Sequence, residues 1–143
     1  MGFSGDFRGF TAGTLFDGGL GTELYERGFY INRPFEELNL SSPSDVKAVH
    51  RDYLESGAEF LTLNTFAASR LQLKEFDLDG KLPEIVEAAV RIANDARREF
   101  VAVSKNSGSK PKLAFSMGPL GVLVEPLGSF GLDEARNEFA YVA

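Results

Sequence analysis

The sequence predicts an α/β fold built on parallel strands. Short apolar runs typical of strands alternate with longer stretches of helical period along the 143 residues. Strands separated by helical segments pair in parallel, because a parallel pair needs a long crossover connection. Each predicted strand ends in Gly, Asp, Asn or Thr, and ligands bind at this carboxyl-terminal edge in parallel α/β folds. The chain should therefore carry a candidate site along one edge of its sheet.

The first predicted strand, residues 14–16, stops at the tight turn Asp17-Gly18-Gly19. Residues 21–28 then have the composition of one or two helical turns, closed by Gly28 as a C-cap. The Gly-rich residues 1–13 before this strand are expected to be an irregular N-terminal segment.

A connecting loop is expected over residues 29–41. The next helix has a strong start, because Ser42 can cap it and Pro43 suits its first position. Asp45 complements the positive end of the helix dipole, and Gly57 ends the helix.

Residues 59–66 are the strongest strand candidate, and helical stretches follow at 69–76 and 82–100. The longer stretch repeats apolar residues with the helical period. These residues are Leu82, Ile85, Val86, Ala89, Ile92, Ala93, Ala96 and Phe100. The pattern predicts an amphipathic helix with one face in the core.

A polar loop at 104–112 leads to a third strand at 113–117 and a further helix at 132–143. A closed barrel of eight strands needs at least ~200 residues. Three strands leave two open sheet edges, through which the chain could self-associate. We therefore expect part of a larger fold, with a small α/β domain that finds its missing surface in a partner as the alternative.

Composition excludes several classes of function. Hydrophobic residues make up 43% and charged residues 25% of the chain, as in ordinary globular proteins. The net charge of −6 and the lack of a basic run argue against nucleic acid or an anionic membrane as the partner. No apolar stretch approaches the ~20 residues that span a membrane. Without a secretory signal, the expected location is cytoplasmic.

Cysteine and histidine, the commonest zinc ligands, are scarce in this sequence. It contains no cysteine, which excludes disulfides and any thiolate metal site made by this chain alone. Its single histidine, His50, cannot form a multi-histidine site and is expected to be structural, on or beside the apolar face of its helix.

The segment from Asp17 to Glu23 is the first candidate site. A carboxylate at a strand end, followed by glycines, lies beside exposed backbone N–H groups and can hold a zwitterion. A plain turn in which Gly supplies positive φ is the alternative. A nucleotide-binding module is weakly indicated, because Leu24 follows Gly19-x-Gly21 where the dinucleotide fingerprint needs Gly.

Two further candidates follow the later strands. Asn64 and Thr65 interrupt an apolar strand near its end, so they could face a ligand. Alternatively, Asn64 or Ser69 caps the next helix. Gly118, in Ser116-Met117-Gly118-Pro119, either lets the backbone approach a ligand or forms a turn.

Taken together, these segments resemble the homocysteine S-methyltransferase family. The resemblance begins with Asp17-Gly18-Gly19-Leu20-Gly21-Thr22-Glu23-Leu24 and continues through Glu37-Leu38-Asn39-Leu40 and residues 49–58. Residues 63–69 look like the family's second barrel strand and its tip, and residues 117–121 look like its third.

The resemblance implies a (β/α)8 barrel, of which residues 14–143 would be the N-terminal half with about three β/α units. Glu37-Leu38-Asn39-Leu40 and Glu125-Pro126-Leu127-Gly128 look most like the homocysteine-binding domain of cobalamin-dependent methionine synthase. The methyl donor stays open among methylcobalamin, betaine and S-methylmethionine.

The resemblance also implies an enzyme that converts homocysteine to methionine. In the family, zinc holds the homocysteine sulfur as a thiolate that attacks the donor's methyl group. The zinc ligands are three cysteines on later strands, which this chain lacks. We therefore expect the chain alone to be inactive, and we assign it neither a catalytic group nor a metal ligand. A non-catalytic half-barrel that needs a partner is the alternative.

The amino-acid clamp is the part of the family site that this chain would keep. By resemblance, Asp17 would hold the homocysteine ammonium, and Gly18 and Gly19 would offer N–H groups to the carboxylate. Thr65 and Phe66 would line the pocket at the second strand end, with Asn64 as a weaker candidate.

Overall fold

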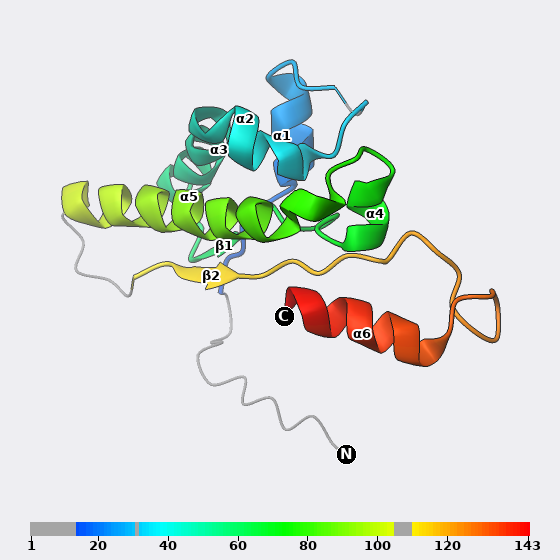
Figure 1. The fold of residues 1–143 in the computed structure, drawn as a ribbon. Helices are drawn as coiled ribbons and strands as arrows, with labels where there is room; N and C mark the ends of the chain where they lie inside the picture. Colours follow the sequence, from blue (N-terminus) through cyan, green and yellow to red (C-terminus); the bar gives the residue numbers. More distant parts are fainter. Residues whose placement is uncertain (1–13, 31, 105–109) are drawn as a thin grey trace.

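A computed structural model describes residues 14–30, 32–104 and 110–143 (Figure 1). The helices and strands follow one another in this order: α1 (Leu20–Glu26), η1 (Phe35–Glu37), α2 (Leu38–Ser41), α3 (Pro43–Glu55), β1 (Phe60–Thr62), α4 (Arg70–Lys74), η2 (Asp79–Lys81), α5 (Leu82–Val103), β2 (Lys112–Ala114) and α6 (Leu132–Val142). The expected irregular segment at 1–13 lies outside the described residues.

The strands are parallel, as predicted. β1 pairs with β2 in the register Leu61 opposite Leu113. On the other side of β1, Phe16 forms a parallel bridge with Phe60, and Glu59 N–H donates to the Leu15 carbonyl at 2.8 Å. Three segments far apart in sequence therefore run side by side in one direction.

The regular strands are shorter than predicted. The strand expected at 59–66 ends at Thr62, because Thr65 N–H turns back to the Leu63 carbonyl at 2.8 Å. The strand expected at 113–117 starts one residue earlier, at Lys112, and ends at Ala114. The first strand is reduced to the bridge at Phe16. Each strand gives way to a turn that carries polar groups.

Two glycines end helices as predicted, each after a residue that serves as the C-cap. Gly28 has φ +93° and Gly57 has φ +100°, a backbone region that favours glycine. After α1, Phe29 N–H donates to the Leu24 carbonyl at 3.1 Å, and Ala58 N–H does the same to Tyr53 after α3 at 3.0 Å. Both ends are Schellman motifs, which satisfy carbonyls at the helix terminus.

The connection between α1 and α3 corrects two predictions. The loop expected over residues 29–41 contains the 3-10 helix η1 and the short helix α2. The Ser42 side chain makes no capping hydrogen bond, although Pro43 begins α3 as predicted. Instead, the Ser42 carbonyl accepts from Asp45 N–H at 3.1 Å, so its backbone rather than its hydroxyl closes the first turn.

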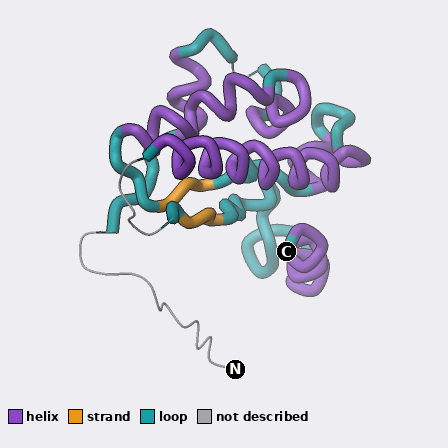
Figure 2. Tube along the Cα trace, turned by 90° about the vertical axis from the view of Figure 1, so that its left-hand side faces the viewer, coloured by secondary structure: helices purple, strands orange, loops and turns teal. Residues whose placement is uncertain are grey.

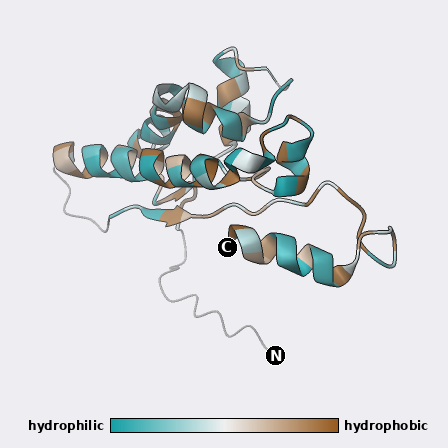
Figure 3. Cartoon of the chain, in the orientation of Figure 1, coloured by the Kyte–Doolittle hydropathy of each residue, from teal (hydrophilic) through white to brown (hydrophobic). Residues whose placement is uncertain are grey.

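Helix α5 is the centre of the core and contributes to every hydrophobic cluster in the described part of the chain. Ile92 packs with α1 and α3, Leu82 and Ile85 pack with α4, and Ala89 and Ala93 pack with Leu63 of the strand region. Brown and teal residues alternate along α5 in Figure 3, as expected for its predicted amphipathic pattern.

Helices α1 to α5 gather on one side of the two strands, and α6 lies apart from them (Figures 1 and 2). Arg70 of α4 donates to both carboxylate oxygens of Glu138 on α6, at 2.7 and 3.2 Å. The Arg70 guanidinium also lies 4.2 Å from the centre of the Tyr141 ring. These contacts attach α6 to the rest of the fold.

Apolar side chains stay exposed beyond β2, including Phe115 and Met117. They are compatible with the expected self-association, which stays a prediction. Among the described residues, none of the helices has the length and apolar character that crossing a membrane requires.

Candidate functional site

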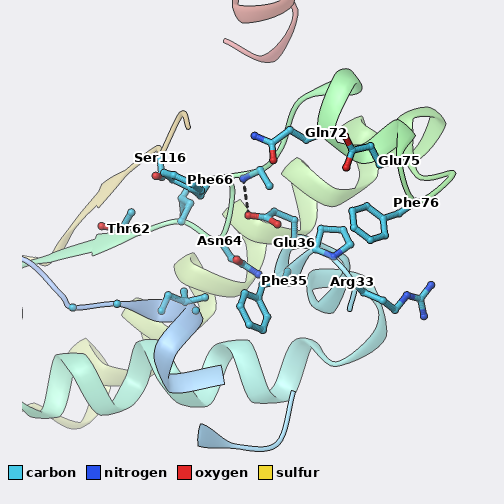
Figure 4. A pocket seen from close by; sticks show the side chains of 17 residues that line it. Arg33, Phe35, Glu36, Thr62, Asn64, Phe66, Gln72, Glu75, Phe76 and Ser116 are labelled. Carbon is cyan, nitrogen blue, oxygen red and sulfur yellow. Dashed lines mark hydrogen bonds between the residues drawn. The ribbon is translucent and has the colours of Figure 1, made fainter. Parts of the chain in front are cut away.

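A cavity of about 600 Å³ opens at the carboxyl ends of the paired segments (Figure 4). Its volume is typical of small-molecule sites. Its lining comes from the turn before α1, from η1, from the end of β1, from α4 and from the segment after β2. The residues are Gly18, Gly19, Leu20, Gly21, Arg33, Pro34, Phe35, Glu36, Thr62, Leu63, Asn64, Phe66, Ala67, Gln72, Glu75, Phe76 and Ser116.

Asp17 lies at the end of the first strand and bonds across to β1. Its Oδ2 accepts from Thr62 N–H at 2.7 Å, and its Oδ1 accepts from the Thr62 hydroxyl at 2.7 Å. The carboxylate thus takes the place of the next backbone carbonyl in the ladder, which frees the main chain to turn at Gly18. Asp17 is half-buried, is not part of a helix cap, and stands beside the lining residues Gly18 and Thr62.

Gly18 and Gly19 line the cavity, and neither N–H donates to another described residue. A Cβ at Gly18 would lie 2.7 Å from the Tyr53 hydroxyl oxygen, so a larger residue would displace that ring. Burial, followed by the carboxylates of Glu23, Asp17 and Glu26, raises the pKa of Tyr53. The N–H groups of Gly18 and Gly19 therefore lie close to carboxylates, and a zwitterionic ligand needs both kinds of group.

Of the three site residues predicted at the end of the second strand, two line the cavity and one lies behind its wall. Phe66 and Asn64 line the cavity. Asn64 is buried, and its Nδ2 donates to the Phe35 carbonyl at 2.7 Å and to Asn39 Oδ1 at 2.9 Å. Thr65 lies behind the cavity wall, where its hydroxyl bonds the Ser116 carbonyl at 2.8 Å. Ser69, not Asn64, caps the next helix by accepting from Gln72 N–H at 3.2 Å.

Glu36 is a site residue that the sequence did not reveal, because its segment was expected to be a loop. It is 4% exposed, lines the cavity, and accepts from Ala67 N–H at 2.8 Å through Oε1. Gln72 and Arg33 also line the cavity and were not predicted. The acidic pair Glu36-Glu37 shortly after Pro34 could have indicated the start of a helix here, since acids are favoured in a first helical turn.

Gly118 joins the third strand end to the second. Its N–H donates to the Phe66 carbonyl at 3.0 Å, and a Cβ there would clash with that same oxygen. We expect Gly118→Ala to lower the free energy of unfolding by about 2 kcal/mol, as overpacking does. Urea denaturation followed by circular dichroism measures this change.

Gly80→Ala is the matched control, because a Cβ at Gly80 meets no atom within 4 Å. We expect this variant to be as stable as the wild type or slightly more stable. Equal losses of stability in the two variants would contradict the steric argument.

The residues of this chain do not fit a zinc site. There is no cysteine in the sequence. Within the described ranges, no group of three or more His, Asp or Glu side chains could hold a metal ion. The part of the chain that the structure describes therefore offers neither a thiolate nor a cluster of three ligands to a metal at this cavity.

Comparison with known proteins gives the family. The family model described as homocysteine S-methyltransferase matches residues 14–141. The chain belongs to the homocysteine S-methyltransferase family. The predicted family is therefore confirmed.

Several members of the homocysteine S-methyltransferase family align with most of this chain, which matches less than half of each relative. Homocysteine S-methyltransferase 4 of Zea mays is 31% identical over 136 residues, which are 90% of this chain and 38% of that protein. Homocysteine S-methyltransferase YbgG of Bacillus subtilis is 29% identical over 84% of this chain and 41% of that protein. Selenocysteine Se-methyltransferase of Brassica oleracea var. italica is 30% identical over 82% of this chain and 34% of that protein.

The fold is similar to that of a solved member of the homocysteine S-methyltransferase family. The metallated form of the homocysteine methyltransferase MmuM from Escherichia coli aligns with a TM-score of 0.67 at 26% identity, over 75% of this chain and 38% of that chain. The chain thus spans about two fifths of the length of the relatives that it matches.

Proposed function

We propose that this chain forms the amino-acid pocket of a homocysteine S-methyltransferase, the enzyme that makes methionine from homocysteine. The observation that carries the proposal is the cavity where three strand ends meet, with Gly18 and Gly19 in its wall and Asp17 beside it. An acid next to free backbone donors suits the charged end of an amino acid.

In this proposal Asp17 binds the ammonium of homocysteine. Each carboxylate oxygen has two lone pairs, and the bonds to Thr62 use one on each oxygen. Those bonds fix the direction of the carboxylate and leave acceptor capacity for a ligand. Gly18 and Gly19 bind the homocysteine carboxylate through their N–H groups, Phe66 and Asn64 form the wall, and Thr65 holds that wall against Ser116.

The proposal is tested by calorimetric titration of L-homocysteine into the wild-type chain and into Asp17→Asn. The side-chain amide of this variant keeps an oxygen acceptor for Thr62 N–H and offers an N–H donor to the Thr62 hydroxyl, so the local fold should persist. Losing a hydrogen bond to a charged group costs about 1.5 to 3 kcal/mol, so we expect binding to weaken at least about tenfold.

Asp79→Asn is the matched control, because Asp79 is exposed on η2 and does not line the cavity. We expect this variant to bind like the wild type. Wild-type affinity in Asp17→Asn, or an equal loss in both variants, would remove the assigned role of Asp17.

The zinc-dependent methyl transfer needs ligands that this chain does not contain. We therefore expect the chain alone neither to bind zinc tightly nor to form methionine from homocysteine. The measurement is methionine formation with zinc present and with methylcobalamin, betaine or S-methylmethionine as the donor. Turnover with any of these donors would show that the methyl transfer does not require the missing cysteines.

A further inference from the structure

Glu36 is a buried carboxylate without a cationic partner in the described part of the chain. Its side chain lies on η1 at the cavity wall, 4% exposed (Figure 4). Oε1 accepts from Ala67 N–H at 2.8 Å, whereas Oε2 has no hydrogen bond to any described residue. The nearby cation Arg33 pairs with Glu37 instead, at 3.6 Å. One oxygen of Glu36 is therefore available to a ligand.

Burying a carboxylate without a counter-ion costs free energy, because the charge loses its hydration. A single backbone N–H compensates only part of that loss. A positive charge that enters the cavity can supply the remaining compensation. The rings of Phe35, Phe66 and Phe76 also line it, and aromatic faces attract organic cations.

We propose that Glu36 binds the positively charged group of a small organic ligand. The proposal deepens the proposed function and rests on it only in treating this cavity as a ligand site. The cation has two possible sources: the onium centre of a methyl donor, or the primary ammonium of the amino acid, in which case Glu36 rather than Asp17 binds that ammonium. Both cations would place a compact positive charge next to Glu36 Oε2. Only the onium centre carries methyl groups that would also pack against the phenyl rings.

A purely structural role for Glu36 would require only a hydrogen-bond acceptor, not a negative charge. If the side chain only ties η1 to Ala67, any acceptor of the same shape would serve. Glu36→Gln keeps an amide oxygen for Ala67 N–H and removes the charge. The variant therefore separates binding of a cation from support of the loop.

The experiment titrates the full chain with tetramethylammonium chloride and, separately, with methylammonium chloride at constant ionic strength. Backbone NMR follows the Ala67 amide, which bonds Glu36 directly. We expect a saturable shift in the wild type and at least about tenfold weaker binding in Glu36→Gln. Tighter binding of tetramethylammonium would indicate the onium centre, and tighter binding of methylammonium would indicate the amino acid.

Glu84→Gln is the matched control, since Glu84 is an exposed carboxylate on α5 that does not line the cavity. We expect it to keep the wild-type affinity within about twofold. An equal loss in this variant would overturn the proposal, because only the general negative potential would then attract the cation. Undiminished binding in Glu36→Gln, or no saturable shift in the wild type, would also overturn it.

Two further outcomes are decisive. In the wild type, nuclear Overhauser contacts from the bound methyl protons to the Glu36 side chain are expected, and their absence overturns the proposal without any variant. If Glu36→Gln does not fold, these contacts in the wild type decide the proposal by themselves. If cations bind at Glu36 but L-homocysteine does not bind the chain, the proposed function fails and the cation site stands. If L-homocysteine binds the chain but the cations do not bind at Glu36, the proposed function stands and the cation site fails.

Discussion

Asn39→Leu is expected to lower the free energy of unfolding by about 3 kcal/mol, because it removes three buried hydrogen bonds. Asn39 is fully buried on α2. Its Nδ2 donates to the Asn64 carbonyl at 2.9 Å and to the Ile85 carbonyl at 3.2 Å, and its Oδ1 accepts from Asn64 Nδ2 at 2.9 Å. Leu has the same number and branching of side-chain heavy atoms as Asn, so the variant leaves no cavity at this position. Urea denaturation followed by circular dichroism gives the value.

The control for Asn39 is the same change at the exposed Asn137 of α6, which should alter stability by no more than about 0.5 kcal/mol. Because Asn64 lines the cavity, Asn39→Leu should also weaken ligand binding there. If Asn39→Leu were as stable as Asn137→Leu, the network between Asn39 and Asn64 would have no structural importance.

Lowering the pH from 7 to 4 is expected to destabilise the wild type through His50 by about 3 kcal/mol. His50 lies on α3 with 0% of its surface exposed, and neither ring nitrogen has a hydrogen-bond partner among the described residues. Desolvation by burial lowers the pKa of His50 from 6.5 to about 4.

The direction of the pH effect follows from proton binding by His50 in the two states. Between pH 6.5 and 4 the unfolded chain carries a protonated His50, whereas the folded chain keeps the ring neutral. Protonation therefore stabilises the unfolded state as the pH falls, and folding stability decreases. Above pH 6.5 both states are neutral at this residue, so its contribution no longer changes.

His50→Leu provides the comparison, because it removes the titrating ring and keeps an apolar side chain of similar size. Urea denaturation of both proteins at several pH values separates His50 from the carboxylates. The variant should lose less stability than the wild type below pH 6.5, and the difference should level off near pH 4. Parallel pH profiles would show that the His50 ring is hydrated or paired in solution.

Local features of the sequence predicted much of the fold. The helical period of α5, the glycines that end α1 and α3, and the parallel order of the strands were all read from nearby residues. The apolar position of His50 also followed from the period of its helix. These features depend on backbone preferences and on residues within a few positions, which the sequence presents directly.

The site could be predicted only in part. The segments that form it were identified, because glycines and polar residues follow each predicted strand. The partner of each polar group could not be identified, since those partners lie far away in the chain. Asp17 and Thr62 are 45 residues apart, Thr65 and Ser116 are 51 apart, and Glu36 and Ala67 are 31 apart.

By itself, the sequence determined the parallel α/β class, the position of the main helices, the family and the absence of cysteine ligands for a metal. The tertiary structure alone decided that Thr65 supports the cavity from behind, that Asp17 closes the ladder through Thr62, and that Glu36 enters the cavity as a buried charge. The physical reason is that periodicity and turn preference are properties of neighbouring residues. Burial and hydrogen-bond partners exist only once distant segments have packed together.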